Sequence, residues 1–296
     1  MNEYDKLCLG TVKLGMPDYG FSSGSALSKF DAVDFLNRVE LMGIHRFDTS
    51  PRYGESERIL GQYINQSTKK PIVSSKIDNL ITNRTDTCKM MFASVEASLV
   101  KLNLEKLDIC YLHQNEINII SDPYVHDGLR LLKDQGLVAK TGVSVYSFEE
   151  CEYALESGLF DYIQVPVNVC DISFYDRFIK ESSSTVHFVA RSLLLQGILV
   201  NRDQIIDRIS SGKEILSSLI KLDSIAYGNN ISILQMALAF VFSLKNIDHY
   251  LIGTTSIENL KMNRQALKVK LPIDVFALIY ELASQPKSWS NPRNWK

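Results

Sequence analysis

The chain has 296 residues, of which 45% are hydrophobic and 22% charged, the composition of an ordinary globular protein. Its 32 Lys and Arg residues nearly balance 34 Asp and Glu residues, and a net charge of −2 excludes a polycationic surface built to neutralise nucleic-acid phosphates. Five cysteines with no Cys-x-x-Cys or Cys/His ligand spacing encode neither a disulfide framework nor a zinc ribbon.

Eight short segments rich in Val, Ile, Leu and aromatic residues predict β-strands along the chain. They span residues 6–11, 44–48, 71–76, 107–113, 138–144, 161–166, 185–190 and 250–253. Most of the intervals between them carry apolar residues at helical spacing, as in Phe92, Val95, Leu99 and Leu102. Strands that alternate with helices form parallel βαβ units. Eight units predict the α/β class and a (β/α)8 TIM barrel, with residues 1–296 as a single domain.

The longest interval, between the seventh and eighth strands, holds two helical patterns, at residues 215–227 and 231–242. One of them is expected to be an extra helix. A further pattern covers 274–283, and the chain then ends in SQPKSWSNPRNWK. Its two Trp and two Pro predict an ordered surface loop rather than a helix. We expect Trp289 and Trp295 to close a pocket or to anchor this tail.

The beginning of the chain, MNEYDKLCLG, carries acidic residues where a signal peptide carries basic ones. The longest largely apolar stretch, residues 233–244, falls short of the roughly 18 residues that a membrane-spanning helix needs. We therefore expect a cytoplasmic protein that neither enters a membrane nor binds nucleic acid.

Polar side chains stand at the carboxyl ends of the predicted strands, where barrel enzymes carry their catalytic groups. In chain order these residues are Asp48, Lys76, His113, Ser144, Gln164 and Arg191. Tyr53 follows Asp48 by five residues, in a loop before a helix expected to begin near Glu55. A loop of that length can bring Tyr53 over the mouth of the barrel.

Asp, Tyr, Lys and His together suit proton transfer to a carbonyl group. A tyrosine hydroxyl titrates near about 10, and a neighbouring ammonium stabilises the phenolate and lowers the pKa. We predict that Lys76 is this ammonium and that Asp48 holds it charged. His113 is predicted to donate a hydrogen bond to the substrate oxygen. Such a site requires neither a metal nor a nucleophile.

Other interpretations of these residues remain open at this point. Asp48 and Lys76 alone are as well explained by a structural ion pair in the barrel core. The spacing of Tyr53 and the position of His113 favour catalysis. Lys76 is also a candidate Schiff-base lysine, as in aldolases with barrel folds. A metal hydrolase is disfavoured, because no His-x-His follows the first strand.

Nearly the whole chain resembles the aldo-keto reductase family. The segments that carry the resemblance are GTVKLG, GIHRFDTSPRYGESE, SSK, YLH, GVS, IQVPVN, RSLLLQGIL and IGTTSIENL. The resemblance implies a barrel that binds NADPH, or sometimes NADH, and passes hydride to an aldehyde or ketone. The family's catalytic tetrad maps onto Asp48, Tyr53, Lys76 and His113, with Tyr53 as the general acid.

The resemblance also implies cofactor contacts from the later strands. Ser144 and Gln164 match positions that bind the nicotinamide carboxamide, although Val145 replaces an Asn found in many members. Arg191 stands where many members stack an aromatic ring on the nicotinamide. The loop after it is expected to bring Ser192 and Gln196 to the pyrophosphate.

After the eighth strand, the resemblance leaves the choice between the two cofactors open. Gly253 and Asn259 stand where members that prefer NADPH often place Lys and Arg. Thr254 and Thr255 can still donate hydrogen bonds, and Asn263 matches an asparagine near the adenine. NADPH is therefore the expected cofactor, with NADH possible.

The substrate is expected to be a small-molecule carbonyl compound. Tyr19, Arg52, Gln114 and Asn115 are placed to touch it, and their polarity favours a hydroxylated compound such as a sugar. A competing hypothesis, drawn from relatives that regulate other proteins, is a nicotinamide-sensing binding subunit. Nothing in the sequence predicts the oligomeric state.

Overall fold

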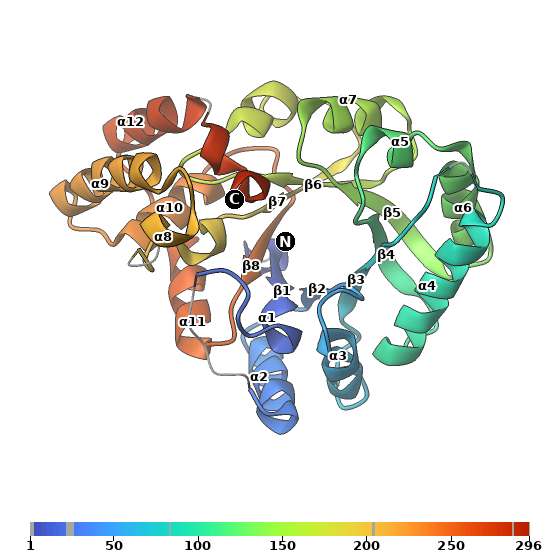
Figure 1. Cartoon of the computed structure of the whole chain (residues 1–296). Helices are drawn as coiled ribbons and strands as arrows, with labels where there is room; N and C mark the ends of the chain where they lie inside the picture. The colour runs from blue at the N-terminus through green and yellow to red at the C-terminus, as the bar shows by residue number, and fades with distance from the viewer. Residues whose placement is uncertain (1–2, 22–26, 83, 203–204, 286, 296) are drawn as a thin grey trace.

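The computed structural model describes residues 3–21, 27–82, 84–202, 205–285 and 287–295. In this part of the chain, eight parallel strands close into a barrel in the order of the sequence (Figure 1). They are β1 (Leu7–Gly10), β2 (Arg46–Asp48), β3 (Ile72–Ile77), β4 (Leu107–Leu112), β5 (Val138–Ser144), β6 (Tyr162–Pro166), β7 (His187–Arg191) and β8 (His249–Gly253). The predicted (β/α)8 fold is confirmed, and every predicted strand boundary lies within two residues of the observed one.

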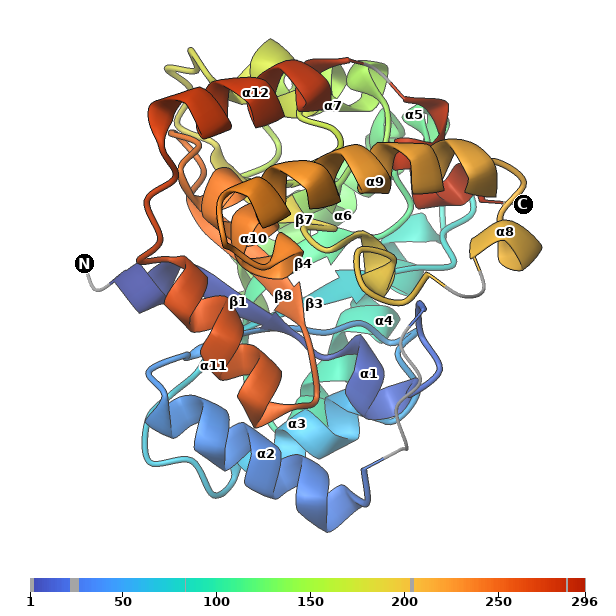
Figure 2. The same ribbon diagram turned by 90° about the vertical axis from the view of Figure 1, so that its left-hand side faces the viewer.

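Helices connect the strands and surround the barrel (Figure 1). They are α1 (Val12–Gly15), α2 (Lys29–Leu41), α3 (Ser56–Ile64), α4 (Thr87–Leu102), α5 (Ile117–Ile120), α6 (Pro123–Asp134), α7 (Phe148–Glu156), α8 (Ile205–Arg208), α9 (Gly212–Gly228), α10 (Ile233–Phe242), α11 (Ile257–Ala266) and α12 (Ile273–Ser284). Three of them, α8 to α10, lie between β7 and β8, which confirms the expected extra helix. Figure 2 shows α9 on the outside of α10.

Side-chain caps fix where several of these helices begin. Ser28, Asp122, Ser147, Ser232 and Ser256 each accept a hydrogen bond from a backbone N–H in the first turn of the helix that follows. Caps of this kind contribute about 1 kcal/mol each. Two of them, Ser147 and Ser256, begin helices soon after β5 and β8. The loops there are therefore short and hold the ends of these strands in place.

One glycine makes room for the packing of the barrel. A Cβ added to Gly142 in β5 would lie 2.5 Å from the ring of Tyr111 in β4. That separation is too small for two carbon atoms, so a larger residue would displace the ring. Tyr111 is fully buried and ranks among the largest buried side chains of the core. Gly142 therefore belongs to the structural frame that holds the strand ends.

The tail after α12 differs from the predicted loop. It forms two short 3-10 turns, Ser288–Ser290 and Pro292–Asn294, while residues 286 and 296 lie outside the described part. Trp289 is buried, and its carbonyl accepts a hydrogen bond from Trp295 Nε1. Trp295 also packs edge-on against Phe21, with 5.7 Å between ring centroids. Both tryptophans thus anchor the tail, and this packing folds the predicted loop into helical turns.

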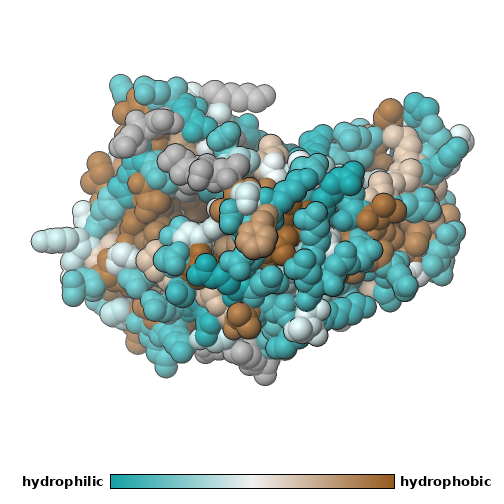
Figure 3. Space-filling model, turned by 90° about the horizontal axis from the view of Figure 1, so that it is seen from below, coloured by the Kyte–Doolittle hydropathy of each residue, from teal (hydrophilic) through white to brown (hydrophobic). Residues whose placement is uncertain are grey.

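Within the described ranges, no single helix is long and apolar enough to cross a membrane, whereas α9 and α10 pass that test only together and are bent by 92°. Figure 3 shows hydrophobic residues scattered among hydrophilic ones on one face. The most exposed large apolar side chains of the described residues include Phe30, Leu41, Val100, Tyr227 and Ile273. They lie on several different helices, and isolated exposures of this kind are ordinary for a protein surface.

Candidate active site

A cavity of about 470 Å³ opens at the carboxyl ends of the strands. Most of the residues predicted from the sequence line it. These are Tyr19, Asp48, Tyr53, Lys76, His113, Ser144, Gln164, Arg191, Ser192, Gln196, Gly253, Thr254, Asn259 and Asn263. Arg52, Gln114, Asn115 and Thr255 are not among its lining residues. The fold therefore gathers side chains that are up to 244 positions apart in the sequence around one hollow.

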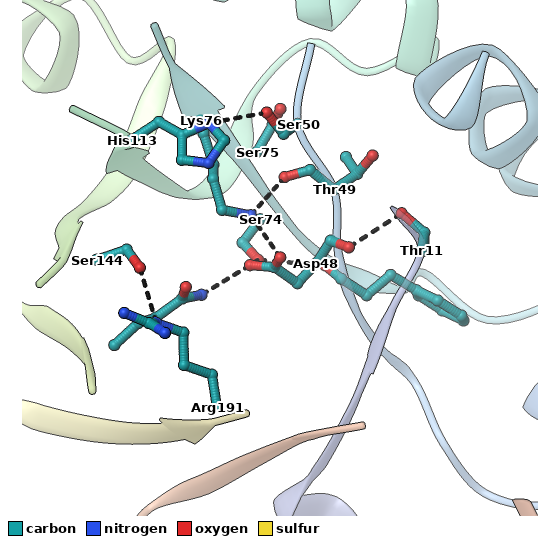
Figure 4. A network of polar contacts seen from close by, with 12 residues as sticks. Thr11, Asp48, Thr49, Ser50, Ser74, Ser75, Lys76, His113, Ser144 and Arg191 are labelled. Carbon is teal, nitrogen blue, oxygen red and sulfur yellow. Dashed lines mark hydrogen bonds and ion pairs between the residues drawn. The ribbon is translucent and has the colours of Figure 1, made fainter. Parts of the chain in front are cut away.

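Lys76 and Asp48 form a buried ion pair at the floor of the cavity (Figure 4). The two charged groups lie 2.5 Å apart, and Lys76 Nζ also donates to the carbonyl of Thr49 at 2.8 Å. Asp48 accepts further hydrogen bonds from Ser74 Oγ at 3.1 Å and from Gln164 Nε2 at 2.7 Å. The carboxylate is thus held by three donors, as the burial of a charge requires.

The charge state of Lys76 follows from these contacts. Burial alone would lower the pKa of Lys76, but the charge of Asp48 and the interaction with Tyr53 raise it well above its ordinary value. The side chain is therefore an ammonium at neutral pH. A Schiff-base lysine needs the opposite, a lowered pKa that frees the amine as a nucleophile. This environment argues against the aldolase alternative.

A close approach of two backbone segments fixes Tyr53. A Cβ added to Gly15 would lie 1.7 Å from the carbonyl oxygen of Tyr53, and Gly54 adopts a left-handed φ of +53°. The chain can therefore turn tightly after Tyr53, immediately before α3. The ring then lies with its centroid 5.0 Å from Lys76 Nζ.

Burial raises the pKa of Tyr53, and the nearby Lys76 ammonium only partly opposes that effect. The prediction that Lys76 lowers the pKa of Tyr53 below its ordinary value is wrong, because the cost of burying a phenolate outweighs the attraction of the ammonium. The phenol consequently carries its proton at neutral pH, which is the state that a proton donor needs.

His113 is the first residue after β4, and its ring meets that of Tyr53 edge-on at 6.1 Å between centroids. Its Nδ1 lies 2.9 Å from Asp78 Oδ2 and 3.3 Å from Ser50 Oγ. Asp78 is buried directly after β3. The sequence reasoning missed Asp78, although a polar residue two positions after Lys76 satisfies the same strand-end criterion.

Arg191 is the last residue of β7 rather than the first residue after it. Its Nε donates to Ser144 Oγ at 3.1 Å, and its Nη2 donates to the carbonyl of Val145 at 2.6 Å. The guanidinium lies 3.8 Å from the ring centroid of Tyr146, a cavity residue that was not predicted. Arg191 is therefore a fixed, buried cation that stacks on an aromatic ring.

The loop that follows β7 has an unusual backbone. Ser192, Leu195 and Gln196 all have left-handed φ angles, between 48° and 60°. Each such residue costs about 1–2 kcal/mol when it is not glycine. The carbonyl of Gln196 accepts a hydrogen bond from the backbone N–H of Phe21, so this loop and the loop after β1 meet beside the cavity. Strain of this kind gathers at functional sites.

The far end of the cavity lies between the ends of β8 and α11. A Cβ added to Gly253 would meet no atom within 4 Å, so space remains open above the strand end. Asn263 is buried there, and Asn259 also lines the cavity. Lys13, which the sequence reasoning missed, adds a cation to the lining, and burial lowers the pKa of Lys13.

Three residues predicted to contact the substrate interact with other parts of the protein instead. Arg52 Nε lies 2.5 Å from Asp78 Oδ2. The amide of Gln114 forms two hydrogen bonds with the backbone of Leu80. Asn115 is fully buried, and its amide bonds to Glu150 and to Arg293 of the tail. We correct these assignments, because the three side chains do not line the cavity and contact neighbouring loops instead.

Comparison with known proteins agrees with this fold. A family model described as the aldo/keto reductase family matches residues 6–284. An uncharacterized oxidoreductase of Mycobacterium tuberculosis (strain ATCC 25618 / H37Rv) is 25% identical, with 92% of this chain and 87% of the relative covered. The L-galactose dehydrogenase of Arabidopsis thaliana is 23% identical, with coverage of 90% and 89%. An aldo/keto reductase of Klebsiella pneumoniae in complex with NADP and acetate shares the fold, with a TM-score of 0.70, 20% identity and coverage of 95% and 92%.

Proposed function

The chain is an oxidoreductase of the aldo/keto reductase family, and from this premise we propose that it uses NADPH or NADH to reduce an aldehyde or ketone to the alcohol. The observation that carries the proposal is the meeting of a protonated phenol, an ammonium and an imidazole on one cavity. The nicotinamide cofactor supplies the hydride when it is bound.

The residues of this chain supply the proton. Tyr53 donates it to the carbonyl oxygen as negative charge develops there. Lys76 then stabilises the phenolate that remains, and Asp48 keeps Lys76 charged and oriented. General acid catalysis of this kind contributes about 10²–10⁴-fold to a rate.

The polar groups that line the cavity suit a dinucleotide. Ser144, Gln164 and Arg191 would hold the nicotinamide end, and the loop with Ser192 and Gln196 would hold the pyrophosphate. At the far end, Thr254, Asn259 and Asn263 of the lining would receive the adenosine part, and Thr255, outside the lining, follows Thr254 in the chain. The NADP complex of the Klebsiella pneumoniae relative supports a nicotinamide cofactor.

For the substrate we propose a hydroxylated carbonyl compound. The polarity of Arg52, Gln114 and Asn115 does not support this proposal, because these residues lie outside the cavity lining. Support comes instead from the similarity to an L-galactose dehydrogenase. Tyr19 remains the predicted substrate contact in the cavity.

The cofactor preference is open to a direct test by Asn259→Arg. We expect a guanidinium at this position to strengthen NADPH binding about tenfold and to leave NADH binding unchanged, because a charge-assisted hydrogen bond contributes about 1.5–3 kcal/mol. Fluorescence titration of the purified protein measures both affinities.

Gln265→Arg is the matched control for this substitution. It adds the same charge to an exposed position of α11 outside the cavity lining, and it should change neither affinity. Equal gains for both cofactors, or no gain for NADPH, would show that Asn259 does not face the 2′-phosphate.

Steady-state oxidation of NADPH and NADH with a set of sugar and simple aldehydes tests the proposed function itself. We expect turnover that depends on the aldehyde. Tight cofactor binding without turnover, together with a stable protein partner in a pull-down, would instead favour the nicotinamide-sensing subunit.

A further inference from the structure

Three buried hydroxyl groups lie behind the loop that carries Tyr53. They belong to Thr11, directly after β1, to Thr49, directly after β2, and to Ser56, the first residue of α3. All three residues are buried, and none of them is among the lining residues of the catalytic cavity. We refer to these three side chains as the hydroxyl cluster. The proton transfer described above does not use them.

The hydroxyl cluster is a continuous chain of hydrogen bonds. Oγ1 of Thr11 lies 2.6 Å from Oγ of Ser56, and Oγ1 of Thr49 lies 3.0 Å from the same Ser56 oxygen. The Thr11 hydroxyl donates to the backbone carbonyl of Asp48 at 3.0 Å (Figure 4). Because each hydroxyl carries one proton, Ser56 then donates to Thr11, and Thr49 donates to Ser56. The chain therefore has one direction, from Thr49 to the end of β2.

At α3, the cluster holds the turn that carries Tyr53. The backbone N–H of Ser56 donates to the carbonyl of Tyr53 at 3.0 Å, so a displacement of Ser56 also displaces the backbone of Tyr53. Glu57, the next residue of α3, adds a second attachment. Its buried carboxylate accepts a hydrogen bond from Ser75 Oγ in β3 at 2.7 Å. Polar contacts thus attach the beginning of α3 to the barrel on two sides.

At the strand ends, the cluster holds the ion pair that acts on Tyr53. The carbonyl of Thr49 accepts a hydrogen bond from Lys76 Nζ at 2.8 Å. The carbonyl of Asp48 accepts from the hydroxyl of Thr11 and also from its backbone N–H, at 2.9 Å. The hydroxyl cluster therefore joins the backbone around the phenol to the backbone around the ion pair.

We propose that Ser56 is a positioning residue that, through the hydroxyl cluster, fixes the Tyr53 phenol relative to the Lys76 ammonium. This inference rests on the proposed function, in which Tyr53 is the proton donor.

Hydrogen bonds suit this task better than apolar contacts do. A buried hydroxyl that loses its partner is unfavourable, and a hydrogen bond weakens steeply when its geometry changes. In the described part of the chain, the cluster bonds to itself and to backbone carbonyls, so it has few alternative arrangements. Precise placement matters, because a shift of about 1 Å at a reacting group can cost about 10²-fold in rate.

Ser56→Ala tests the proposal first. We expect kcat for carbonyl reduction to fall by about 10–10²-fold. KM and the affinity for the cofactor should stay unchanged, because Ser56 lies outside the cavity lining. Steady-state kinetics and fluorescence titration measure these quantities. An unchanged kcat, or a loss that appears only as a raised KM, would overturn the proposal.

Thr87→Val is the matched control. Thr87 is also buried and is the first residue of a helix, α4, and its hydroxyl donates to the carbonyl of Ile81 at 3.0 Å. It is not among the lining residues of the cavity. Loss of this hydroxyl should lower stability and leave kcat unchanged.

A double-mutant cycle separates positioning from general stabilisation. In a Tyr53→Phe background there is no phenol hydroxyl to place, so Ser56→Ala should lower the residual kcat no further. If Ser56 only stabilises the fold, the substitution should lower kcat by the same factor in both backgrounds. That result would overturn the proposal.

Two substitutions of Thr49 decide the question if Ser56→Ala does not fold. Thr49→Val keeps the shape of the side chain and removes the hydroxyl, whereas Thr49→Ser keeps the hydroxyl and removes the methyl group. We expect a lower kcat in Thr49→Val alone. Equal activities of the two variants would overturn the proposal, because the hydroxyl would then have no effect of its own.

A further readout does not depend on turnover. Fluorine-19 NMR of the chain labelled with 3-fluorotyrosine reports on its 13 tyrosines, and the signal that disappears in Tyr53→Phe belongs to Tyr53. We expect this signal to shift in Ser56→Ala and to stay in place in Thr87→Val. An unchanged Tyr53 signal in Ser56→Ala would overturn the inference. A shifted signal in a protein without reductase activity would instead refute only the proposed function.

Discussion

Replacing Tyr53 by Phe is expected to lower kcat for carbonyl reduction by about 10²–10⁴-fold while cofactor affinity stays unchanged. The variant loses only the hydroxyl, and the ring still fills its place beside Lys76 and His113. Without a proton donor, negative charge that develops on the carbonyl oxygen has no acid to neutralise it. Single-turnover kinetics with prebound NADPH measure the chemical step, and fluorescence titration measures the affinity.

Tyr63→Phe is the control for this substitution. Tyr63 is also a fully buried tyrosine, and its hydroxyl donates to Glu40 at 2.8 Å, away from the cavity. Its loss should cost some stability and no activity. An unchanged kcat in Tyr53→Phe would contradict the assignment of the acid and would transfer that role to another donor of the cavity, with His113 first.

Replacing Lys76 by Met is expected to cost about 3–5 kcal/mol of the free energy of unfolding, because it leaves the buried carboxylate of Asp48 without its cation. Both side chains are 3% exposed, so water cannot replace the lost partner. Urea denaturation followed by circular dichroism measures the loss. Folding raises the pKa of Lys76, so its contribution is complete at neutral pH and is lost only as the pH rises past about 10.4, its unfolded value.

The double variant Asp48→Asn with Lys76→Met separates stability from catalysis. Removing both charges should restore much of the lost stability, because a buried ion pair replaced by neutral groups is often close to neutral in its effect. Activity should remain lost, since the phenolate of Tyr53 has no ammonium beside it. A double variant as unstable as the single one would mean that packing around Lys76, and not its charge, accounts for the loss.

The fold and the centre of the site could be predicted because each leaves a regular trace in the sequence. Alternating strand and helix patterns determine the barrel, and the barrel in turn places every strand end at one rim. Asp48, Lys76 and His113 follow from that rule alone. Tyr53 required only a loop of suitable length.

Loop side chains could not be predicted in the same way. Gln114 and Asn115 directly follow His113, yet their amides bond to Leu80 and Glu150. The direction of a loop side chain depends on partners far away in the sequence. Two residues that are adjacent in the chain can therefore point to different partners. The same limit applies to the tail, whose turns depend on where Trp289 and Trp295 pack.

The pKa of Tyr53 also could not be predicted from the sequence, because it depends on the balance between burial of the phenol and the charge of Lys76. The spacing of Lys76 and Tyr53 predicts that they are neighbours, but not how deeply the phenol is buried. Burial turns out to dominate, and so the pKa of Tyr53 is raised rather than lowered. Asp78 also stands at a strand end, but only the structure shows its 2.9 Å contact with His113.

Transfer of deuterium from NADPH labelled at the reactive position of the nicotinamide tests the central claim most directly. The measurement is mass spectrometry of the alcohol formed from a set of hydroxylated and simple aldehydes, with wild-type protein and with Tyr53→Phe. The account predicts one deuterium per alcohol molecule in the wild type and almost no product with Tyr53→Phe. Bound cofactor with no deuterium in any alcohol, or equal product from both proteins, would contradict it.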